Sequence, residues 1–421
     1  MKHLDYKFSV ISLTLSIITI CSSFTVPTYA LGDNPWVTTS AGSNSWHSLA
    51  ASSDGSHLAA TGDNNSDVYT SNDYGVTWQV HITGVPNYWL SNIASSSDGS
   101  HLVVGNWYGD IYTSSDYGVT WTDQINSGVR QWSTISSSSS GQYLVAATKY
   151  GIARDIIISN DYGVTWASLT NAGNHFWSSL AISANGKDII AGTAGNPDNL
   201  FTSNDYGVTW TTQTSLGQQI WSTVTISSDG KAMLAASGGT IYMSMDSGAT
   251  WLNLNLPGNH PWKNIGISSD YKYIVAAPSN YSNGDDIFIS SDSGATWIDQ
   301  TDAGSGDWFS VTISSDGSRI FAADNGTNTG SFPDYTHNPG YIWSAYNPSA
   351  IAKSVASTTP NTATLPNTTT LPNTSSAKIN APITGFGSTK SDSSMEIYLS
   401  IVGLTLIIGA VGYRKYFKIF N

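Results

Sequence analysis

The chain has 421 residues, of which 11% are charged, with a formal net charge of −13 and a single cysteine. A chain this acidic repels nucleic acid and anionic lipid surfaces, and one cysteine cannot form an internal disulfide. There is no glycine-rich phosphate loop, HExxH sequence or Cys/His metal spacing, so we expect no cofactor and no metal site.

The first thirty residues, Met1–Ala30, have the pattern of a secretory signal peptide. Two lysines precede the apolar run Phe8–Ile20, and the segment ends in VPTYA, whose small residues suit cleavage after Ala30. The cysteine, Cys21, lies inside this segment, and the bulky residue before it disfavours a lipoprotein. We therefore expect a secreted mature protein without thiol chemistry.

Residues Leu31–Tyr346 repeat one unit seven times. Each unit holds four short alternating segments, as in STVTIS, AMLAAS, TIYMS and TWLNLNL, separated by turn sequences such as SSDG. A period in the forties with four strands per unit is typical of propeller blades, so we predict an all-β, seven-bladed β-propeller of four-stranded blades. The units open at spacings of 41 to 46 residues with Trp46, Trp89, Trp132, Trp177, Trp221, Trp262 and Trp308.

Six units also contain a nine-residue segment, the nonamer, as in TSNDYGVTW at Thr70–Trp78. Its last eight residues follow the pattern S-x-D-x-G-x-T-W. Its Asp, Ser and Thr side chains can hydrogen-bond the backbone of a turn, and its glycine supplies a conformation that other residues resist. The pattern resembles the Asp-box, or BNR repeat, of sialidases, sortilin-type proteins and photosystem II assembly factors. The resemblance implies a structural hairpin between the third and fourth strands, away from the ligand site. Its aspartates are Asp73, Asp116, Asp161, Asp205, Asp246 and Asp292.

The seventh unit ends without a fourth strand, and the missing strand is expected at the start of the domain. The segment Pro35–Trp46 matches Thr77–Trp89, which places Trp36 where each nonamer has its tryptophan. We therefore predict that the N-terminal strand completes the seventh blade and leaves no open sheet edge.

The sialidase resemblance implies a catalytic site that this chain cannot assemble. Such enzymes have an arginine triad and a tyrosine nucleophile with a glutamate partner. The only glutamate is Glu396, outside the repeats, and the repeats hold three arginines, of which Arg319 follows an SSDG turn on the opposite face. We predict that the protein is not an enzyme. A glycoside hydrolase, sialidase-like or based on aspartates alone, and an assembly protein like the photosystem II factors are the alternatives.

Binding is expected on the loops that join the second strand to the third and the fourth strand to the next blade, where the units diverge. Exposed aromatic side chains there suit sugar rings or protein surfaces. We predict that Trp107, Tyr108 and Arg130 form the centre of a face that binds a glycan or a protein. Ordinary loop variation is the competing explanation. Further candidates are Tyr88, Tyr150, Arg154, His175, His260, Tyr281 and Tyr335.

The charge of the domain bears on the kind of partner. Between Leu31 and Ala350 there are 26 aspartates and 8 lysines and arginines, which leave a net charge of −18. This excess favours an uncharged or cationic partner, with Arg130 able to pair a single carboxylate.

Three further segments follow the repeats. Asn347–Ser394 is rich in Ser, Thr, Pro and Asn and has too few large apolar residues for a core, so we predict a disordered stalk. Met395–Tyr413 is mostly apolar and is predicted to be a transmembrane helix. Arg414–Asn421 is predicted to be a basic cytoplasmic tail.

The stalk also carries APITG at Ala381–Gly385, which resembles the LPxTG sorting signal but has alanine in place of leucine. The resemblance implies cleavage between Thr384 and Gly385 and linkage to the cell wall. Retention by the membrane helix is the alternative. In both cases we predict a monomeric propeller displayed at the cell surface as a non-catalytic binding or adhesion module.

Overall fold

The computed structural model describes residues 36–62, 67–82, 90–151, 154–254, 256, 258, 260–278, 286–304, 306–329, 336–347, 396–401 and 404–409. The chain divides into two compact units, Met1–Ala352 and Lys353–Asn421. The predicted signal peptide, the sorting motif and nearly all of the stalk lie outside the described residues.

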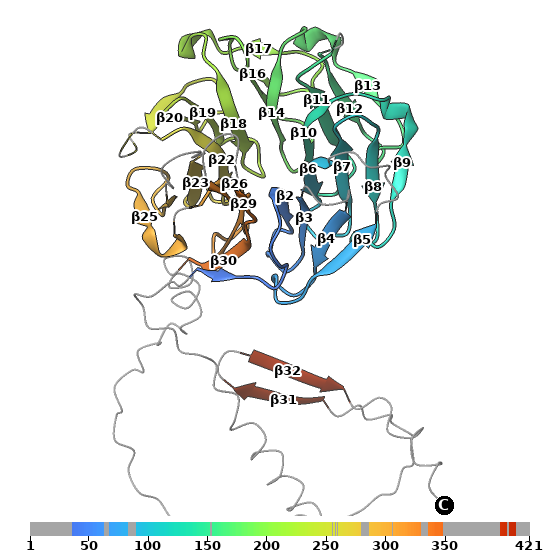
Figure 1. Cartoon of the computed structure of the whole chain (residues 1–421), viewed down its shortest axis with the longest axis vertical. Coiled ribbons are helices and arrows are strands. Elements are labelled where there is room, and N and C mark those ends of the chain that lie inside the picture. The colour runs from blue at the N-terminus through green and yellow to red at the C-terminus, as the bar shows by residue number, and fades with distance from the viewer. Residues whose placement is uncertain are drawn as a thin grey trace, which may run out of the picture. The chain divides into compact units, whose positions relative to one another are not determined.

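The first unit is a ring of seven four-stranded antiparallel sheets, as predicted (Figure 1). From the inner strand outward, blade 1 contains β2 Trp46–Ala51, β3 Leu58–Gly62, β4 Asp67–Ser71 and β5 Gln79–Ile82; blade 2 contains β6 Leu90–Ser95, β7 Leu102–Asn106, β8 Ile111–Ser114 and β9 Thr122–Gln124; blade 3 contains β10 Trp132–Ser137, β11 Leu144–Thr148, β12 Ile156–Ser159 and β13 Ala167–Ser168. Blade 4 contains β14 Trp177–Ile182, β15 Ile189–Thr193, β16 Phe201–Ser203 and β17 Thr211–Thr212; blade 5 contains β18 Trp221–Ile226, β19 Met233–Ser237, β20 Thr240–Ser244 and β21 Leu252–Leu254. Blade 6 contains β22 Trp262–Ile267, β23 Ile274–Pro278, β24 Ile287–Ser290 and β25 Ile298–Gln300; blade 7 contains β26 Trp308–Ile313, β27 Arg319–Asp324, β30 Ile342–Tyr346 and β1 Val37–Thr38.

Short elements lie between some of the blade strands. A hairpin of β28 Thr327–Thr329 and β29 Thr336–Asn338 lies between β27 and β30 in the sequence. Single 3₁₀ turns follow four outer strands: η2 Ile125–Ser127, η3 Thr170–Ala172, η4 Thr214–Leu216 and η5 Thr301–Ala303.

The N-terminal strand closes the ring, which confirms the prediction. β1 pairs antiparallel with β30, so that Val37 lies opposite Ser344 in the seventh blade. Trp36 is 5% exposed and its ring centroid lies 6.4 Å from that of Trp308. Because the chain passes from β1 of the seventh blade directly into β2 of the first blade, the two ends of the ring are joined.

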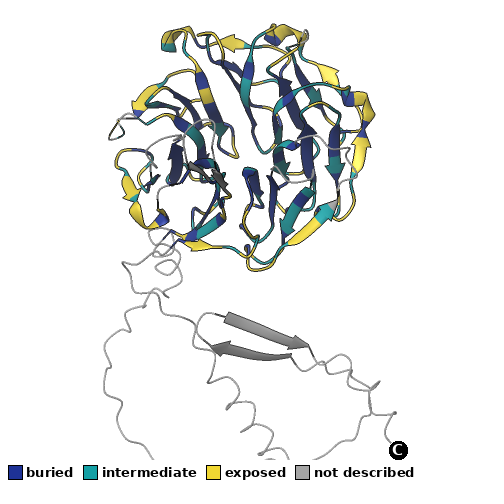
Figure 2. Ribbon diagram, in the orientation of Figure 1, coloured by how far each residue is buried: buried dark blue, intermediate teal, exposed yellow. Residues whose placement is uncertain are grey.

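The hydrophobic core consists of seven clusters, each between two neighbouring blades. Figure 2 shows the buried inner strands and the exposed outer rim. Six opening tryptophans are at most 1% exposed and fill these clusters. Blade 2 differs from the prediction: Leu90, 2% exposed, pairs with Asn106 as Trp46 pairs with Gly62. Leu90 therefore takes the place expected for Trp89, which lies outside the described residues.

The two faces of the ring carry different connections. One face, here called the box face, carries the six nonamers and the turns that join first and second strands. The opposite face, the loop face, carries the divergent connections. On the box face the turns are linked by backbone hydrogen bonds between blades, and Ser315 N donates to Ser53 O at 2.7 Å across the closure.

In the second unit the structure differs from the predicted transmembrane helix. β31 Glu396–Ile401 pairs antiparallel with β32 Leu404–Gly409. The β-branched and aromatic residues of these segments favour strands, and a glycine lies between them. Within the described part of the chain, no helix has the length and apolar character needed to cross a membrane.

Candidate functional site

Each nonamer is a hairpin whose polar side chains bind its own turn. In blade 4, Asp205 Oδ1 accepts hydrogen bonds from Ser203 Oγ at 2.9 Å and from Thr209 N at 2.8 Å. Asp205 Oδ2 accepts from Thr209 Oγ1 at 2.6 Å, and Trp210 Nε1 donates to Gly207 O at 3.0 Å. The equivalent carboxylate bonds recur at Asp73, Asp116, Asp161, Asp246 and Asp292.

The turn needs two consecutive residues with positive φ. Tyr206 has φ 62° and Gly207 has φ 82°, and Val208 N donates to Asp205 O at 3.2 Å. This is the geometry of a type I′ turn, which suits the twist of a hairpin. Tyrosine adopts it only at a conformational cost, and here the ring contacts the neighbouring blade: the centroids of Tyr206 and Tyr143 lie 5.2 Å apart.

The box carboxylates are therefore engaged in structure and are not arranged for catalysis. Burial raises the pKa of Asp205, but hydrogen bonds from Thr209 and Ser203 outweigh it and lower the pKa overall. The arginines of the repeats are also dispersed. Arg319 lies on the box face, with its guanidinium carbon 3.7 Å from the ring centroid of Tyr74, whereas Arg130 and Arg154 belong to the loop face.

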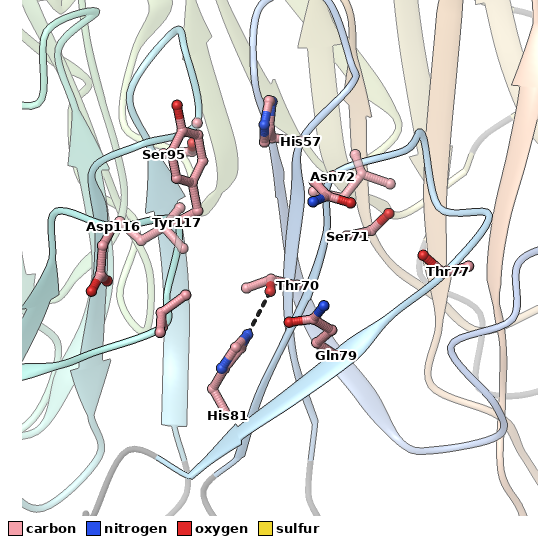
Figure 3. Close-up of a pocket in the computed structure, with 14 residues that line it drawn as sticks. His57, Thr70, Ser71, Asn72, Thr77, Gln79, His81, Ser95, Asp116 and Tyr117 are labelled. Atoms are coloured by element: carbon pink, nitrogen blue, oxygen red, sulfur yellow. Dashed lines mark hydrogen bonds between the residues drawn. The ribbon is translucent and has the colours of Figure 1, made fainter. Parts of the chain in front are cut away.

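A cavity of about 230 Å³ opens between blades 1 and 2, beside the first two boxes (Figure 3). His81 on β5 contacts Thr70 Oγ1 through Nε2 at 2.8 Å, and Asp116 lies across the cavity on blade 2. Burial lowers the pKa of His81, and Asp116 partly opposes this. At the position of His81, blade 2 has Gln124, whose Nε2 donates to Thr113 Oγ1 at 2.6 Å. His81 thus makes the same contact with a threonine of the third strand that Gln124 makes in blade 2. The cavity therefore reflects a difference in side-chain packing between blades and is not assigned as a functional site.

On the loop face, the structure brings together the two segments predicted to form the binding site. Arg130 N donates to Gly109 O at 3.1 Å, next to Trp107 and Tyr108. Tyr108 is 54% exposed. The Arg130 guanidinium is committed to Asp155, with Nη1 2.5 Å from Oδ1, so its charge is already paired.

A third loop extends this surface. The ring of Trp107 lies 5.9 Å from that of Tyr150, which is 43% exposed, and Lys149 Nζ lies 5.4 Å from the centroid of Tyr150. We call Trp107, Tyr108, Lys149 and Tyr150 the aromatic patch. Trp107, Tyr108 and Tyr150 were candidates from the sequence, whereas Lys149 was not, because one lysine in a variable loop carries no pattern.

The remaining candidates have structural surroundings or lie outside the described residues. His175 Nδ1 contacts Asp198 Oδ2 at 2.5 Å, and its ring packs on Phe201 at 4.7 Å. His260 packs in the same way on Phe288 at 5.0 Å. The guanidinium of Arg154 stacks on Phe176 at 3.7 Å. Outside the described residues lie Tyr88, Tyr281 and Tyr335.

A metal site is not found where the structure can be examined. Over the described residues, no three His, Cys, Asp or Glu side chains gather in a way that could hold a metal ion.

Comparison with known proteins places the fold. The BNR-Asp box repeat model matches residues 111–124, which span β8, the second box and β9. No curated protein matches the chain. Among solved structures, YCF48 bound to D1 peptide is 15% identical with a TM-score of 0.56, covering 75% of this chain and 98% of its own.

Two further solved structures have the same TM-score of 0.56. YCF48 from Cyanidioschyzon merolae is 16% identical and covers 75% of this chain and 99% of its own. The Cps50 (Swd1) β-propeller domain of Myceliophteria thermophila is 10% identical and covers 74% and 99%. At these identities the likeness concerns the fold alone. With its six boxes and its closed ring, the chain is a seven-bladed β-propeller built on BNR-Asp box repeats.

Proposed function

We propose that this protein is a non-catalytic binding module that holds a segment of a partner protein on the loop face of its propeller. The observation that carries the proposal is the aromatic patch, in which one loop of blade 2 and one loop of blade 3 place exposed tyrosine rings beside a lysine. Aromatic side chains offer a large contact area at a small cost in conformational entropy.

Two observations favour binding over hydrolysis. The six box carboxylates are hydrogen-bonded within their own turns, and the three arginines of the repeats are divided between the two faces. YCF48, which has the same fold, was solved with a peptide. That precedent favours a peptide over a glycan here, and an assembly factor that recognises a protein segment fits the same proposal.

The proposal includes export of the module. The leader at Met1–Ala30 supports it, and attachment at the cell surface through Ala381–Gly385 stays a hypothesis from the sequence. Fractionation of cells that express the tagged full chain tests this part separately from binding.

Parallel peptide and glycan arrays probed with the full chain test the binding proposal. We expect bound peptides, and we expect Trp107→Ala combined with Tyr108→Ala and Tyr150→Ala to weaken them at least about ten-fold, since anchoring aromatics are each typically hot spots. A matched control replaces two box-face tyrosines, Tyr162→Asn and Tyr206→Asn, because asparagine tolerates positive φ.

The control should keep the wild-type affinity. Glycans bound in place of peptides, or peptides bound equally by the triple variant, would contradict the proposal.

A further inference from the structure

The position after the first residue of each inner strand breaks the symmetry of the ring. In all seven blades the ladder between inner and second strand shifts register at or directly after this position, which is a β-bulge, and bulges redirect side chains. Serine occupies this position in blades 2 to 5, and its hydroxyl donates to a carbonyl of the second strand, as in Ser91 Oγ to Gly105 O at 3.0 Å. The other three serines do the same: Ser133, Ser178 and Ser222.

The three remaining blades carry large side chains at this position, and these blades are consecutive in the closed ring. Lys263 of blade 6 lies over Phe309 of blade 7, with Nζ 4.0 Å from the ring centroid. The Phe309 ring lies 5.5 Å from the ring of His47 in blade 1. Phe309 and His47 also line the central channel, a cavity of about 310 Å³ bounded by the inner strands. The three side chains therefore form one wall at the loop-face mouth of the channel.

Two further charged side chains act on Lys263. Burial lowers the pKa of Lys263; Asp307 opposes this, and the positive charge of Lys149 lowers the pKa further. Lys149 is the lysine of the aromatic patch, so the patch and the channel mouth belong to the same face of the ring. Across the described part of the chain, neither amine lies at salt-bridge distance from a carboxylate.

We propose that Lys263, Phe309 and His47, here called the channel-mouth site, bind a carboxylate of the partner peptide. The inference rests on the proposed function and adds the chemistry of the ligand. The Lys263 amine supplies a charge-assisted hydrogen bond to a carboxylate oxygen, and the rings of Phe309 and His47 cover the apolar carbon atoms behind it. The carboxylate comes from the end of the chain or from an Asp or Glu side chain.

The net charge of −18 in the domain does not oppose such a ligand at this point. Coulomb energy falls with distance, and charges on the rim and box face are screened over about 8–10 Å of salt solution, whereas the Lys263 amine would touch the ligand. The charge of Asp307, which acts on Lys263, is the local charge that the ligand has to overcome. The expected preference for an uncharged or cationic partner therefore applies to the surface as a whole and not to the channel mouth.

Three small probes test the proposal by calorimetric titration of the full chain. N-acetyl-phenylalanine carries a terminal carboxylate, its amide lacks the charge, and N-acetyl-glutamic acid α-amide carries a side-chain carboxylate. We expect at least one acid to bind about ten-fold more tightly than the neutral amide, as a charged hydrogen bond predicts. The tighter acid identifies the source of the carboxylate.

Two lysine variants test whether the preference for the acid probes depends on Lys263. Lys263→Met, which keeps length and removes charge, should abolish the preference for acid. Lys272→Met is the matched control, because Lys272 also lies over an aromatic ring, at 4.6 Å from Tyr273, but on the box face. Equal binding of acids and amide, or an acid preference that survives Lys263→Met in folded protein, would overturn the inference.

The result is independent of the peptide array. If acids bind through Lys263 but no peptide binds, the channel-mouth site stands as a carboxylate site and the proposed function fails. If peptides bind through the aromatic patch and Lys263→Met changes neither peptides nor acids, the proposed function stands and the channel-mouth site fails.

Discussion

The aspartate of the repeated box is the residue on which each outer hairpin depends. In blade 4, one carboxylate satisfies a serine hydroxyl, a threonine hydroxyl and a backbone amide within seven residues of chain. The same turn places a tyrosine at positive φ, and the bonds from the carboxylate compensate for that strain. The box therefore recurs because every blade needs its own turn.

Asp205→Ala should lower the free energy of unfolding by about 1–3 kcal/mol, the usual range for losing hydrogen bonds to a charged group. The pKa of Asp205 is lowered in the folded state, so this stabilisation is complete above the ordinary value of 3.8 and is lost as pH falls through the folded pKa. Urea unfolding at neutral pH and well below pH 3.8 should show the cost of the substitution shrinking in acid.

Asp205→Asn is the control, because an amide oxygen can still accept from Thr209 N while the charge is gone. Asp205→Asn should lower the free energy of unfolding by less than Asp205→Ala does. Loss of peptide binding at unchanged stability would contradict the structural role of the box.

At the scale of single elements, one of the shortest strands, β1, closes the ring. β1 consists of two exposed residues, yet it is the outer strand of blade 7 and connects the first blade to the last. Most of its anchoring comes from Trp36, which is buried in the cluster between blades 6 and 7.

Trp36→Ala should therefore destabilise the ring by about 3–5 kcal/mol, as truncation of a buried tryptophan does. Thermal unfolding followed by circular dichroism measures the change. Val37→Ala is the control, since Val37 is 51% exposed and should alter the melting temperature little. An unchanged melting temperature in Trp36→Ala would show that closure does not depend on this contact.

Repetition made these elements predictable from sequence, and departures from repetition were harder to predict. The period, the four strands per blade and the place of Trp36 all follow from comparing units with one another. Leu90 was missed because the adjacent Trp89 fitted the pattern better than the residue that enters the strand. The hairpin of β31 and β32 was missed because hydropathy does not distinguish an apolar helix from an apolar strand pair.

The candidate site was predictable only in part for a related reason. Trp107 and Tyr108 stood out as aromatic residues in a divergent loop. Lys263, Phe309 and His47 lie within regular strands, next to a conserved position of the repeat unit, and only the ring brings them together. An alignment of the seven units at the bulge would have revealed serine in four of them and large side chains in three.

For the molecule as a whole, the ring is closed and nearly uniform on the box face and asymmetric on the loop face. On the box face, backbone hydrogen bonds between the turns link neighbouring blades. On the loop face, Lys263 occupies a position at which four other blades have a hydrogen-bonded serine. A partly buried ammonium group is unfavourable for folding unless it is compensated. The charge of Asp307 compensates Lys263 only in part, since the pKa of Lys263 stays lowered, so binding explains this lysine better than stability does.

Lys263→Met should accordingly raise the free energy of unfolding at neutral pH while it removes carboxylate binding. The sign follows from the lowered pKa: between the folded pKa and the ordinary 10.5 the unfolded state holds more protons, so the wild type gains stability as pH rises through this window. The excess of the variant's free energy of unfolding over that of the wild type should thus be largest below the folded pKa and vanish towards pH 10.5.

Urea denaturation of both proteins across this pH range measures the difference. Lys231→Met is the control, since the Lys231 side chain is 66% exposed. A variant less stable than wild type at neutral pH would mean that the contact with Phe309 outweighs the burial of the charge.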